Sequence, residues 1–516
     1  MVARATTVAF LGLNTHKVDV QAHMGAGMPS FQIVGLPDKG VDESRERVRS
    51  ALQSIGIALP SKRIIVNLAP ADLRKTGSHY DLPIALALLF EMKILPQSDG
   101  DGAIALGELS LDAHITSVPG VLPASLFASH HDYGVICPHA CGQEARFAGD
   151  HVDILAPDSL IALVNHWRGT QTIAPPQLPI NSCEQKDTHP LPDFVDIKGQ
   201  EDAKYAIEIA ASGGHHMLMV GSPGAGKSML ASRLHTILPP LSSQEALEVS
   251  MIHSLAGTMP KESIVTQRPY RAPHHSASLP SLIGGDKLAR PGEVSLCHRG
   301  VLFLDELPEF SRSTLEALRQ PIESGFVLVA RAKAHCHYPA QFQLIAAMNP
   351  CPCGYHGSEK VECSCTKTKI RAYQNRISGP LYDRIDLYVD VPELNARELI
   401  QPTPSQQTNS TTIAKRVAQT RQLQQERFRT MNLNTLYLNA QADGKILEEI
   451  APLGHKESHI LADAIDTLKL SARSYHKVLR LARTLCDMDT QDMNAPINKY
   501  HIAHALNYRR KVLHKV

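Results

Sequence analysis

The chain has 516 residues, 43% hydrophobic and 20% charged, a composition typical of a globular protein with roughly two to four domains. A formal net charge of +1 excludes a global field that attracts nucleic acid, so any such binding must use a local basic patch. The most apolar run, LPIALALLF at residues 82–90, is too short to span a bilayer, and no membrane association is expected.

The N-terminal residues predict a buried strand rather than a signal peptide, because no small-residue cleavage site follows the apolar run. Ten cysteines without a secretion signal favour a reducing, cytoplasmic setting, where disulfides are rare and clustered cysteines point towards metal.

Residues 1–170 alternate short apolar strands with helical segments. We expect a strand at RIIVNLAP (63–70), a helix at YDLPIALALLF (80–90) and a hairpin over AIALGELSLD (103–112). Residues 171–193 are rich in Pro, Gln and Thr without an apolar period, and are predicted to be a linker. In residues 194–400 strands and helices alternate again, which predicts a parallel α/β core.

A phosphate-binding loop is predicted in HHMLMVGSPGAGKSML (215–230), where G-x-x-x-x-G-K-S lies between an apolar strand and a helix-forming run. Glycines let backbone N–H groups face the phosphates, Lys227 reaches the β- and γ-phosphates, and Ser228 binds Mg²⁺. The predicted nucleotide-binding residues are Gly221, Ser222, Pro223, Gly224, Ala225, Gly226, Lys227, Ser228 and Met229.

Two further strands end in polar residues suited to ATP hydrolysis. GVLFLDELPEF (300–310) ends its apolar run at Asp305 and Glu306, of which the first can hold Mg²⁺ and the second can orient the attacking water. The alternative is an acidic pair at a helix N-terminus. QLIAAMN (343–349) ends in Asn349, which could sense the γ-phosphate or the water. Together these residues predict an ATPase with ATP and Mg²⁺ as cofactors.

Four cysteines follow Asn349 in two C-x-C pairs, Cys351/Cys353 and Cys363/Cys365. Two such pairs joined by a short loop can close a tetrahedral thiolate shell around Zn²⁺ within residues 351–365. An iron–sulfur cluster and free or redox-active thiols are the alternatives. A catalytic zinc is not expected, since four thiolates fill the shell.

Several motifs, taken in order, resemble the ComM/YifB family of bacterial AAA+ ATPases, which are related to the magnesium-chelatase ATPase subunit and the MCM helicases. They are GSPGAGKS, RPYRAPHHSAS, ARPGEVSLCHRGVLFLDELPEF, AAMNPCPCG and SGPLYDRIDLYVDV, and the resemblance covers nearly the whole chain. It implies a homo-oligomeric ring of six subunits, with ATP bound between subunits. It also implies branch migration on single-stranded and branched DNA during natural transformation.

The resemblance assigns two arginines. Arg384 in LYDRID resembles the arginine finger that a subunit offers to its neighbour's γ-phosphate, although it could instead form an ion pair with Asp383 or Asp386. Arg473 resembles the sensor arginine of a C-terminal helical lid at residues 413–516, with Arg480 as its competitor.

Two segments are candidates for gripping DNA in the ring. Residues 321–342 are predicted to form a hairpin with Arg331 and Lys333 at its tip, where MCM-like proteins place a pore hairpin. Residues 268–293, which include His274 and His275, are basic and too irregular for a core. A solvated charged face is the alternative for the hairpin tip, and loop stabilisation or a subunit contact for the two histidines.

The N-terminal segments 74–89 and 107–128 resemble the Lon protease domain, a ribosomal S5 domain 2-like α+β fold. Ser78 is the only spare candidate for a nucleophile, and no lysine lies between Lys93 and Lys186 to act as its base. We therefore expect a non-proteolytic scaffold. Its candidate DNA contacts are Arg45, Arg47, Arg49, Lys62, Arg63, Arg74 and Lys75, although a solvated helix face is the preferred explanation for the first three.

The predicted function is therefore an ATP-dependent DNA motor. ATP hydrolysis follows from the residues, whereas the action on DNA follows from the resemblance. An ATP-dependent protein-remodelling or metal-insertion ATPase is the alternative.

Overall fold

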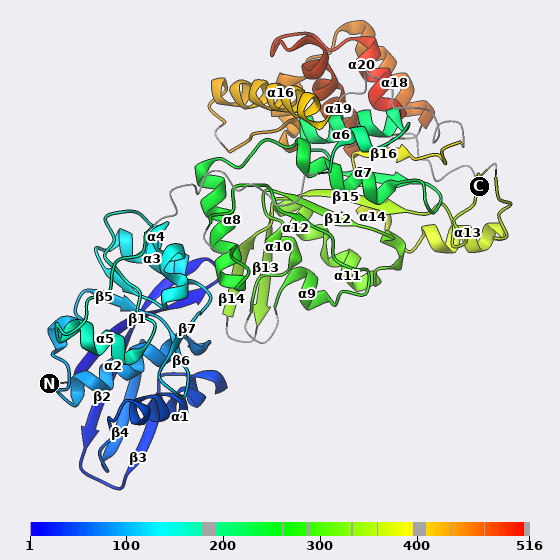
Figure 1. Cartoon of the computed structure of the whole chain (residues 1–516). Coiled ribbons are helices and arrows are strands. Elements are labelled where there is room, and N and C mark those ends of the chain that lie inside the picture. The colour runs from blue at the N-terminus through cyan, green and yellow to red at the C-terminus, as the bar shows by residue number, and fades with distance from the viewer. Residues whose placement is uncertain are drawn as a thin grey trace.

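The computed structural model describes residues 2–177, 192–260, 263–285, 289–331, 334–358, 360–395, 409–433, 435–468 and 470–509. Figure 1 shows three regions along the chain: an N-terminal mixed α/β region in blue and cyan, a central α/β region in green, and a group of helices in orange and red. No helix among the described residues is apolar enough over a sufficient length to cross a membrane.

A seven-stranded sheet organises the N-terminal region, in the order β3-β4-β2-β1-β5-β8-β9. Its strands are β1 (Ala3–Leu11), β2 (Asn14–Gly25), β3 (Ser30–Val34), β4 (Arg63–Ala69), β5 (Ala103–Ala105), β8 (Gly134–Ile136) and β9 (Ile154–Leu155). Its helices are α1 (Lys39–Ser54), α2 (Asp81–Glu91), α3 (Val121–His130), α4 (Gly142–Arg146) and α5 (Leu160–Trp167). Ten consecutive residues of α2, from Asp81 to Phe90, are buried, which explains its unbroken apolar sequence.

The structure confirms the strand predicted at 63–70 and the helix predicted at 80–90. It corrects the hairpin predicted over 103–112. β5 joins the large sheet between β1 and β8, and the hairpin is formed instead by β6 (Glu108–Leu109) with β7 (Ile115–Thr116). Periodicity alone could not choose, because either pairing buries the same apolar side chains.

The central region holds a parallel five-stranded sheet in the order β11-β12-β15-β10-β16. Its strands are β10 (Met217–Val220), β11 (Tyr270–Arg271), β12 (Val301–Leu304), β15 (Gln343–Met348) and β16 (Leu387–Asp390). The inner strands β10, β12 and β15 are buried along their whole length, as expected of a sheet with helices on both faces. The segment 268–293, predicted to be too irregular for a core, supplies the edge strand β11.

Helices of the central region lie between these strands in the chain. They are α6 (Glu201–Gly213), α7 (Lys227–Leu234), α8 (Ser243–Ala256), α9 (Leu279–Ile283), α10 (Glu293–Leu296), α11 (Arg312–Ala317), α12 (Arg319–Ser324), α13 (Lys367–Gln374) and α14 (Gly379–Tyr382). The hairpin predicted at 321–342 is confirmed as β13 (Phe326–Arg331) paired antiparallel with β14 (Ala334–Pro339). It projects from the side of the central region opposite the C-terminal helices (Figure 1).

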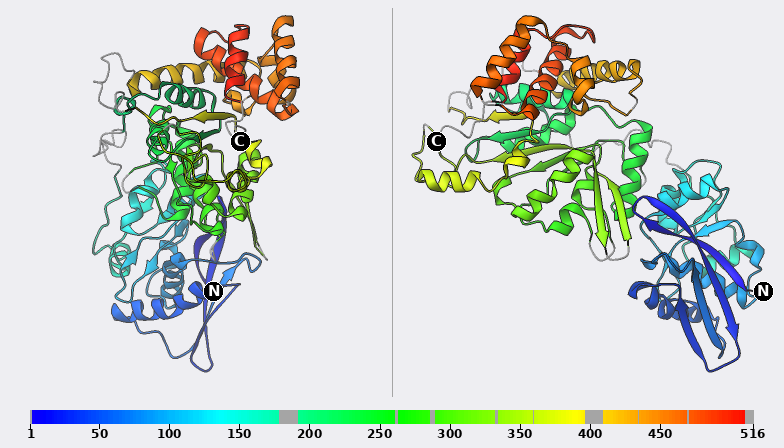
Figure 2. Two further views of the ribbon diagram at one scale, coloured as in Figure 1. Left: turned by 90° about the vertical axis from the view of Figure 1, so that its right-hand side faces the viewer. Right: turned by 180° about the vertical axis from the view of Figure 1, so that it is seen from behind.

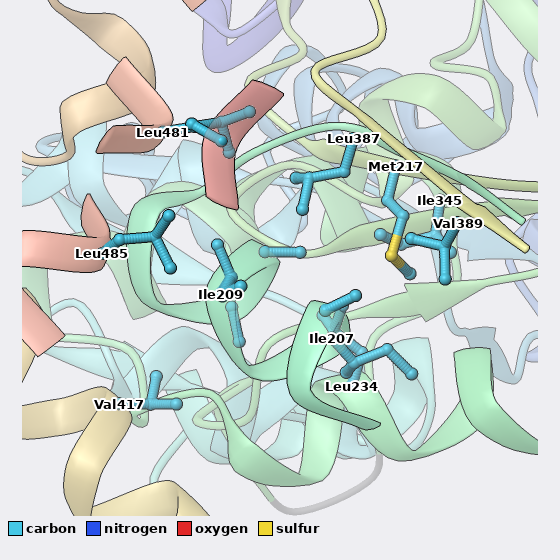
Figure 3. Close-up of a cluster of buried hydrophobic side chains, with 14 of the residues drawn as sticks. Ile207, Ile209, Met217, Leu234, Ile345, Leu387, Val389, Val417, Leu481 and Leu485 are labelled. Atoms are coloured by element: carbon cyan, nitrogen blue, oxygen red, sulfur yellow. The ribbon is translucent and has the colours of Figure 1, made fainter. Parts of the chain in front are cut away.

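The C-terminal helices share a core with the central sheet. They are α16 (Ser410–Thr430), α17 (Gly444–Ile450), α18 (His455–Leu468), α19 (Ala472–Thr490) and α20 (Lys499–Asn507). Figure 3 shows Val417 of α16 and Leu481 and Leu485 of α19 in one buried cluster with Ile207 and Ile209 of α6, which also includes residues of the sheet. The helical region is therefore packed onto one face of the sheet through α6.

The N-terminal region docks on the central region at two places. The turn between β1 and β2 lies beside the β13–β14 hairpin, and its Phe10, Leu11 and Leu13 pack against the core cluster that contains that hairpin (Figure 2). A second contact joins α3 and α4 to α8, where the Ser254 hydroxyl donates to Glu144 at 2.5 Å and Gly120 N–H donates to the Ser254 carbonyl at 3.1 Å.

Candidate nucleotide site

The loop at Gly221–Ser228 connects β10 to α7, as its sequence predicts. Gly224 and Gly226 have φ of +78° and +89°, in the left-handed region that costs a side chain free energy but costs glycine little. A Cβ at either position would meet open space, so the backbone conformation rather than crowding requires glycine here. The loop therefore presents backbone N–H groups at the carboxyl end of a buried strand, where parallel α/β sheets bind ligands.

Lys227 is buried within the loop, and its ammonium donates to the carbonyls of Gly221 and Ser222 at 2.7 and 2.9 Å. It also donates to Asn349 Oδ1 at 3.1 Å, which brings the end of β15 to the loop. Burial lowers the pKa of Lys227, and the charges of Asp305 and Glu306 oppose that effect. The lysine side chain is thus fixed inside the loop, between two of its carbonyls and the end of β15.

Ser228, in the loop that follows β10, contacts Asp305, which follows β12: the serine hydroxyl donates to Asp305 Oδ2 at 2.6 Å. The other carboxylate oxygen, Oδ1, accepts the backbone N–H of Glu306 at 2.9 Å. A hydroxyl and a carboxylate at this spacing are the hard oxygen ligands that Mg²⁺ takes from a protein beside a bound phosphate. The donor set therefore fits the magnesium ion that the sequence predicts.

Glu306 is exposed and has a left-handed backbone, with φ of +50°, a conformation uncommon for a residue with a side chain. Its Oε2 lies 3.3 Å from His275 Nδ1. His275 belongs to the segment after β11, whereas His274 instead pairs with Ser276 at 2.7 Å. One histidine of the predicted DNA-contacting segment therefore touches the predicted water-orienting carboxylate.

The four cysteines of the two C-x-C pairs converge, and their sulfur atoms all lie within 4.8 Å of one another. Cys351 Sγ lies 3.3 Å from Cys353 Sγ and 3.7 Å from Cys363 Sγ. Hydrogen bonding from Tyr355 N–H is the largest influence that lowers the pKa of Cys353 to about 6. The cysteines are free, and this set could hold a metal ion.

Arg384 lies at the amino end of the parallel strands, whereas the phosphate-binding loop lies at their carboxyl end. It precedes β16, whereas the loop follows β10, and these two strands are parallel neighbours that span about 13 Å. Its guanidinium pairs with Glu323 of α12, not with Asp383 or Asp386 as the alternative had it. Arg384 therefore cannot serve the loop of its own chain.

The two lid candidates also lie away from that loop. Arg473 is exposed at the start of α19, and its charge, with that of Arg384, helps to hold the pKa of Glu323 below its usual value. Arg480 is bound to the Ala442 carbonyl at 2.5 Å and to Asp443 at 3.1 Å. Arg473 is thus the more exposed of the two, and its charge acts at Glu323, the partner of Arg384.

The predicted DNA contacts divide into three groups. Lys333 and the side chain of Arg331 lie outside the described residues. Arg47 and Lys75 turn inward, which corrects their assignment as candidate contacts: Arg47 binds the fully buried Asp81, and Lys75 donates to the Pro70 carbonyl. Arg45, Arg49, Lys62 and Arg63 are partly or fully exposed, as is Arg74.

Sequence reasoning missed Glu323, the partner of Arg384, and the contact between His275 and Glu306. It also missed Gln200, whose amide donates to the carbonyls of Ala225 and Pro392 at 3.4 and 2.6 Å and so joins the loop to the segment after β16. No local pattern marks these residues, because each acts on a residue far away in the sequence.

Family models described as magnesium chelatase subunit ChlI, subunit ChlI of Mg-chelatase and magnesium chelatase subunit ChlI C-terminal match residues 193–399, 20–141 and 407–509. The chain is 40% identical over 504 residues to the uncharacterized protein YifB of Escherichia coli, covering 98% of this chain and 96% of YifB. It is 40% identical over 505 residues to the competence protein ComM of Haemophilus influenzae, with the same coverage.

A more distant relative is the magnesium-chelatase 38 kDa subunit of Rhodobacter capsulatus, 28% identical over 33% of this chain and 53% of that subunit. The similarity to YifB and ComM spans both the N-terminal and the central regions, whereas the chelatase subunit matches only part of the chain. The chain therefore belongs to the YifB/ComM family, a magnesium-chelatase-like group of AAA+ proteins.

Proposed function

We propose that the protein is an ATPase whose active site is the loop at Gly221–Ser228 with the ends of β12 and β15. The observation that carries the proposal is the convergence of Ser228 on Asp305 and of Lys227 on Asn349, from three parallel strands. When bound, Mg²⁺ would be held by Ser228 and Asp305 and would neutralise phosphate charge. Glu306 orients the attacking water, and Asn349 senses the γ-phosphate.

The arginines support a ring. Arg384 lies at the opposite end of the strands from the loop, so it reaches an active site only if that site belongs to a neighbouring subunit. A heterologous contact of this kind, repeated around an axis, closes a ring, and six subunits is the number that the family resemblance implies. Arg473, whose charge also acts at Glu323, is the better candidate for the sensor arginine.

The proposed substrate is single-stranded and branched DNA, moved through the ring as in branch migration during natural transformation, in the cytoplasm. Two observations support it: the relative named as competence protein ComM, and the β13–β14 hairpin, the element in which the sequence predicts Arg331 and Lys333 as DNA contacts. Metal insertion is the alternative, suggested by the chelatase relative. Chelatase activity would need a separate tetrapyrrole-binding partner.

The metal proposed for the four cysteines is Zn²⁺. Sulfur atoms at the corners of a tetrahedron around zinc, with Zn–S of 2.3 Å, are about 3.8 Å apart. The separations of 3.3 to 3.7 Å among the sulfur atoms of Cys351, Cys353 and Cys363 are close to that spacing and far longer than a disulfide bond, and Cys365 Sγ lies within 4.8 Å of each of them. Four thiolates leave no open position, so the zinc would be structural.

A labelled four-way DNA junction with a homologous core tests the motor function, with protein, Mg²⁺ and ATP present and Glu306→Gln as the hydrolysis-dead control. Resolution of the junction into duplex arms by the unsubstituted protein alone is the expected result. If ATP is hydrolysed but neither junction nor forked DNA is remodelled or stimulates hydrolysis, the DNA substrate is wrong and the ATPase assignment stands.

A further inference from the structure

The four-cysteine knob, defined as residues 350–358 and 360–365, sits against the phosphate-binding loop. It begins directly after Asn349, whose side chain binds Lys227. Gly354 of the knob faces Pro223 of the loop: a Cβ built on Gly354 would lie 2.5 Å from Pro223 Cδ and 2.6 Å from its Cγ. Only a residue without a side chain allows the backbone at position 354 to approach the Pro223 ring this closely.

The knob is also tied to the segment after β16. Ser358 donates to Glu393 at 3.2 Å, and Lys360 donates to the Leu394 carbonyl at 2.6 Å. Residues 391–392 of that segment touch the other end of the loop, since Gln200 bridges Pro392 to Ala225 and a Cβ on Gly221 would lie 2.2 Å from the Val391 carbonyl. The loop is therefore enclosed between the knob and a segment that the knob itself anchors.

The shape of the knob depends on what holds the four sulfur atoms together. Thiolates at the separations of 3.3 to 3.7 Å found among Cys351, Cys353 and Cys363 repel one another without a cation between them, and thiols gain only weak S–H···S hydrogen bonds. Among the described residues between Cys353 and Cys363, none belongs to a helix or strand that would keep the two pairs together. A metal ion would close this loop and remove its conformational freedom, as a cross-link does.

We propose that the metal-loaded knob is a positioning element of the nucleotide site, which holds Pro223 and the loop in the phosphate-binding conformation. The metal contacts no nucleotide; it acts through Gly354 and Pro223. The inference rests on the proposed ATPase function. It adds that nucleotide affinity depends on the metal, so that conditions which strip the four thiolates of metal also weaken ATP binding.

The test measures metal content by elemental analysis and the affinity for a fluorescent ATP analogue by titration, both on the full chain. Cys353→Ser should lose the metal and bind the analogue about tenfold more weakly. Cys141→Ala, which removes a buried cysteine of the N-terminal region, is the matched control and should change neither quantity. Stripping zinc from the unsubstituted chain with a chelator should reproduce the Cys353→Ser affinity, and added Zn²⁺ should restore it.

A second pair of variants separates the contact from the metal. Gly354→Ala keeps all four thiolates but places a methyl group against Pro223, so the metal should stay while affinity falls. Gly357→Ala is the control, since Gly357 has φ of +84° against +88° for Gly354, but a Cβ there meets open space. The control isolates the effect of backbone strain from that of the contact.

Three outcomes would overturn the proposal, and they differ from failure of the ATPase assignment. They are an unchanged affinity in the metal-free chain, equal affinities for the two glycine variants, and a purified chain that takes up no metal. If instead the unsubstituted, metal-loaded chain binds no analogue at all, while Lys227→Ala behaves identically, the ATPase assignment itself fails.

Discussion

At the scale of single residues, the polar side chains of the proposed active site lie at the carboxyl ends of three parallel strands, β10, β12 and β15. Asp305 and Glu306 are adjacent in the sequence, yet they face different partners: Asp305 binds Ser228, and Glu306 contacts His275. The left-handed backbone of Glu306 turns its side chain away from that of Asp305. This division is what a metal ligand and a water-orienting base require of neighbouring carboxylates.

Glu306→Gln should bind the ATP analogue with unchanged affinity and hydrolyse ATP at least about 100-fold more slowly, because an amide cannot accept the water's proton. Steady-state phosphate release measures this rate. Glu309→Gln is the matched control, since Glu309 is also exposed and close by but pairs with Arg376 at 2.8 Å. A turnover rate within twofold of the unsubstituted chain would remove Glu306 from its role.

His275→Ala should raise ATP hydrolysis measured without DNA, because His275 draws the Glu306 carboxylate towards the segment after β11. Partly exposed ion pairs contribute up to about 1 kcal/mol, so the rise should not exceed about fivefold. His274→Ala is the control: its ring contacts His275 but not Glu306. A rate that falls to the level of Glu306→Gln would show instead that His275 holds Glu306 in its active position.

At the scale of elements, a buried ion pair fastens α19 to the start of β16. Lys477 of α19 lies 3.2 Å from Asp386 and donates to the Ile385 carbonyl at 3.1 Å. Burial alone would raise the pKa of Asp386, but Lys477 and His215 outweigh it and hold the pKa well below its usual value. This pair fixes the end of the strands that carries Arg384, two residues before Asp386.

Asp386→Asn should lower the free energy of unfolding of this region at pH 7 by about 3 to 5 kcal/mol, because it leaves Lys477 buried without its partner. A group whose pKa is lower in the folded state stabilises the fold above its unfolded value, near 4, and loses that contribution as pH falls. The deficit of the variant should therefore shrink below about pH 4.

Thermal unfolding followed from pH 7 to pH 3 measures this dependence. Asp383→Asn, which changes a less buried carboxyl three residues earlier, is the control and should unfold like the unsubstituted chain at each pH. A deficit of Asp386→Asn that stays constant across this range would contradict the argument.

At the scale of the whole molecule, the loop and Arg384 lie at opposite ends of the parallel strands. Each proposed active site therefore combines the loop of one subunit with Arg384 of another. The N-terminal region is docked as well, through the β1–β2 turn on the hairpin and through Glu144 on α8. Movement of the hairpin should therefore be transmitted to the N-terminal region that packs against it.

Mixing two inactive variants tests the shared site. Lys227→Ala and Arg384→Ala should each hydrolyse ATP very slowly, one for lack of phosphate binding and the other for lack of the neighbour's charge. In an equal mixture, about a quarter of the interfaces join an intact loop to an intact Arg384, and activity should recover to that extent. Arg319→Ala, near the same end of the strands, is the control for nonspecific loss of charge.

Recovery no greater than the sum of the two variants, with assembly confirmed by light scattering, would place Arg384 outside the active site. Its pairing with Glu323 would then be structural.

The sequence by itself determined the phosphate-binding loop, the strand ends at Asp305 and Asn349, the parallel α/β core and the four-cysteine set. These features are readable because their residues lie within a few positions of one another, and their chemistry demands a fixed spacing and a strand or helix beside it. The hairpin at 321–342 was equally readable from its apolar strand and basic turn.

Only the tertiary structure decided which distant residues meet. It paired Arg384 with Glu323, His275 with Glu306 and Gly354 with Pro223. It also turned Arg47 and Lys75 inward, two residues that the sequence had offered as exposed DNA contacts. The physical reason is that these contacts join elements far apart along the chain, and the packing of whole helices and sheets, not local preference, selects among the many partners a charged or small residue could take.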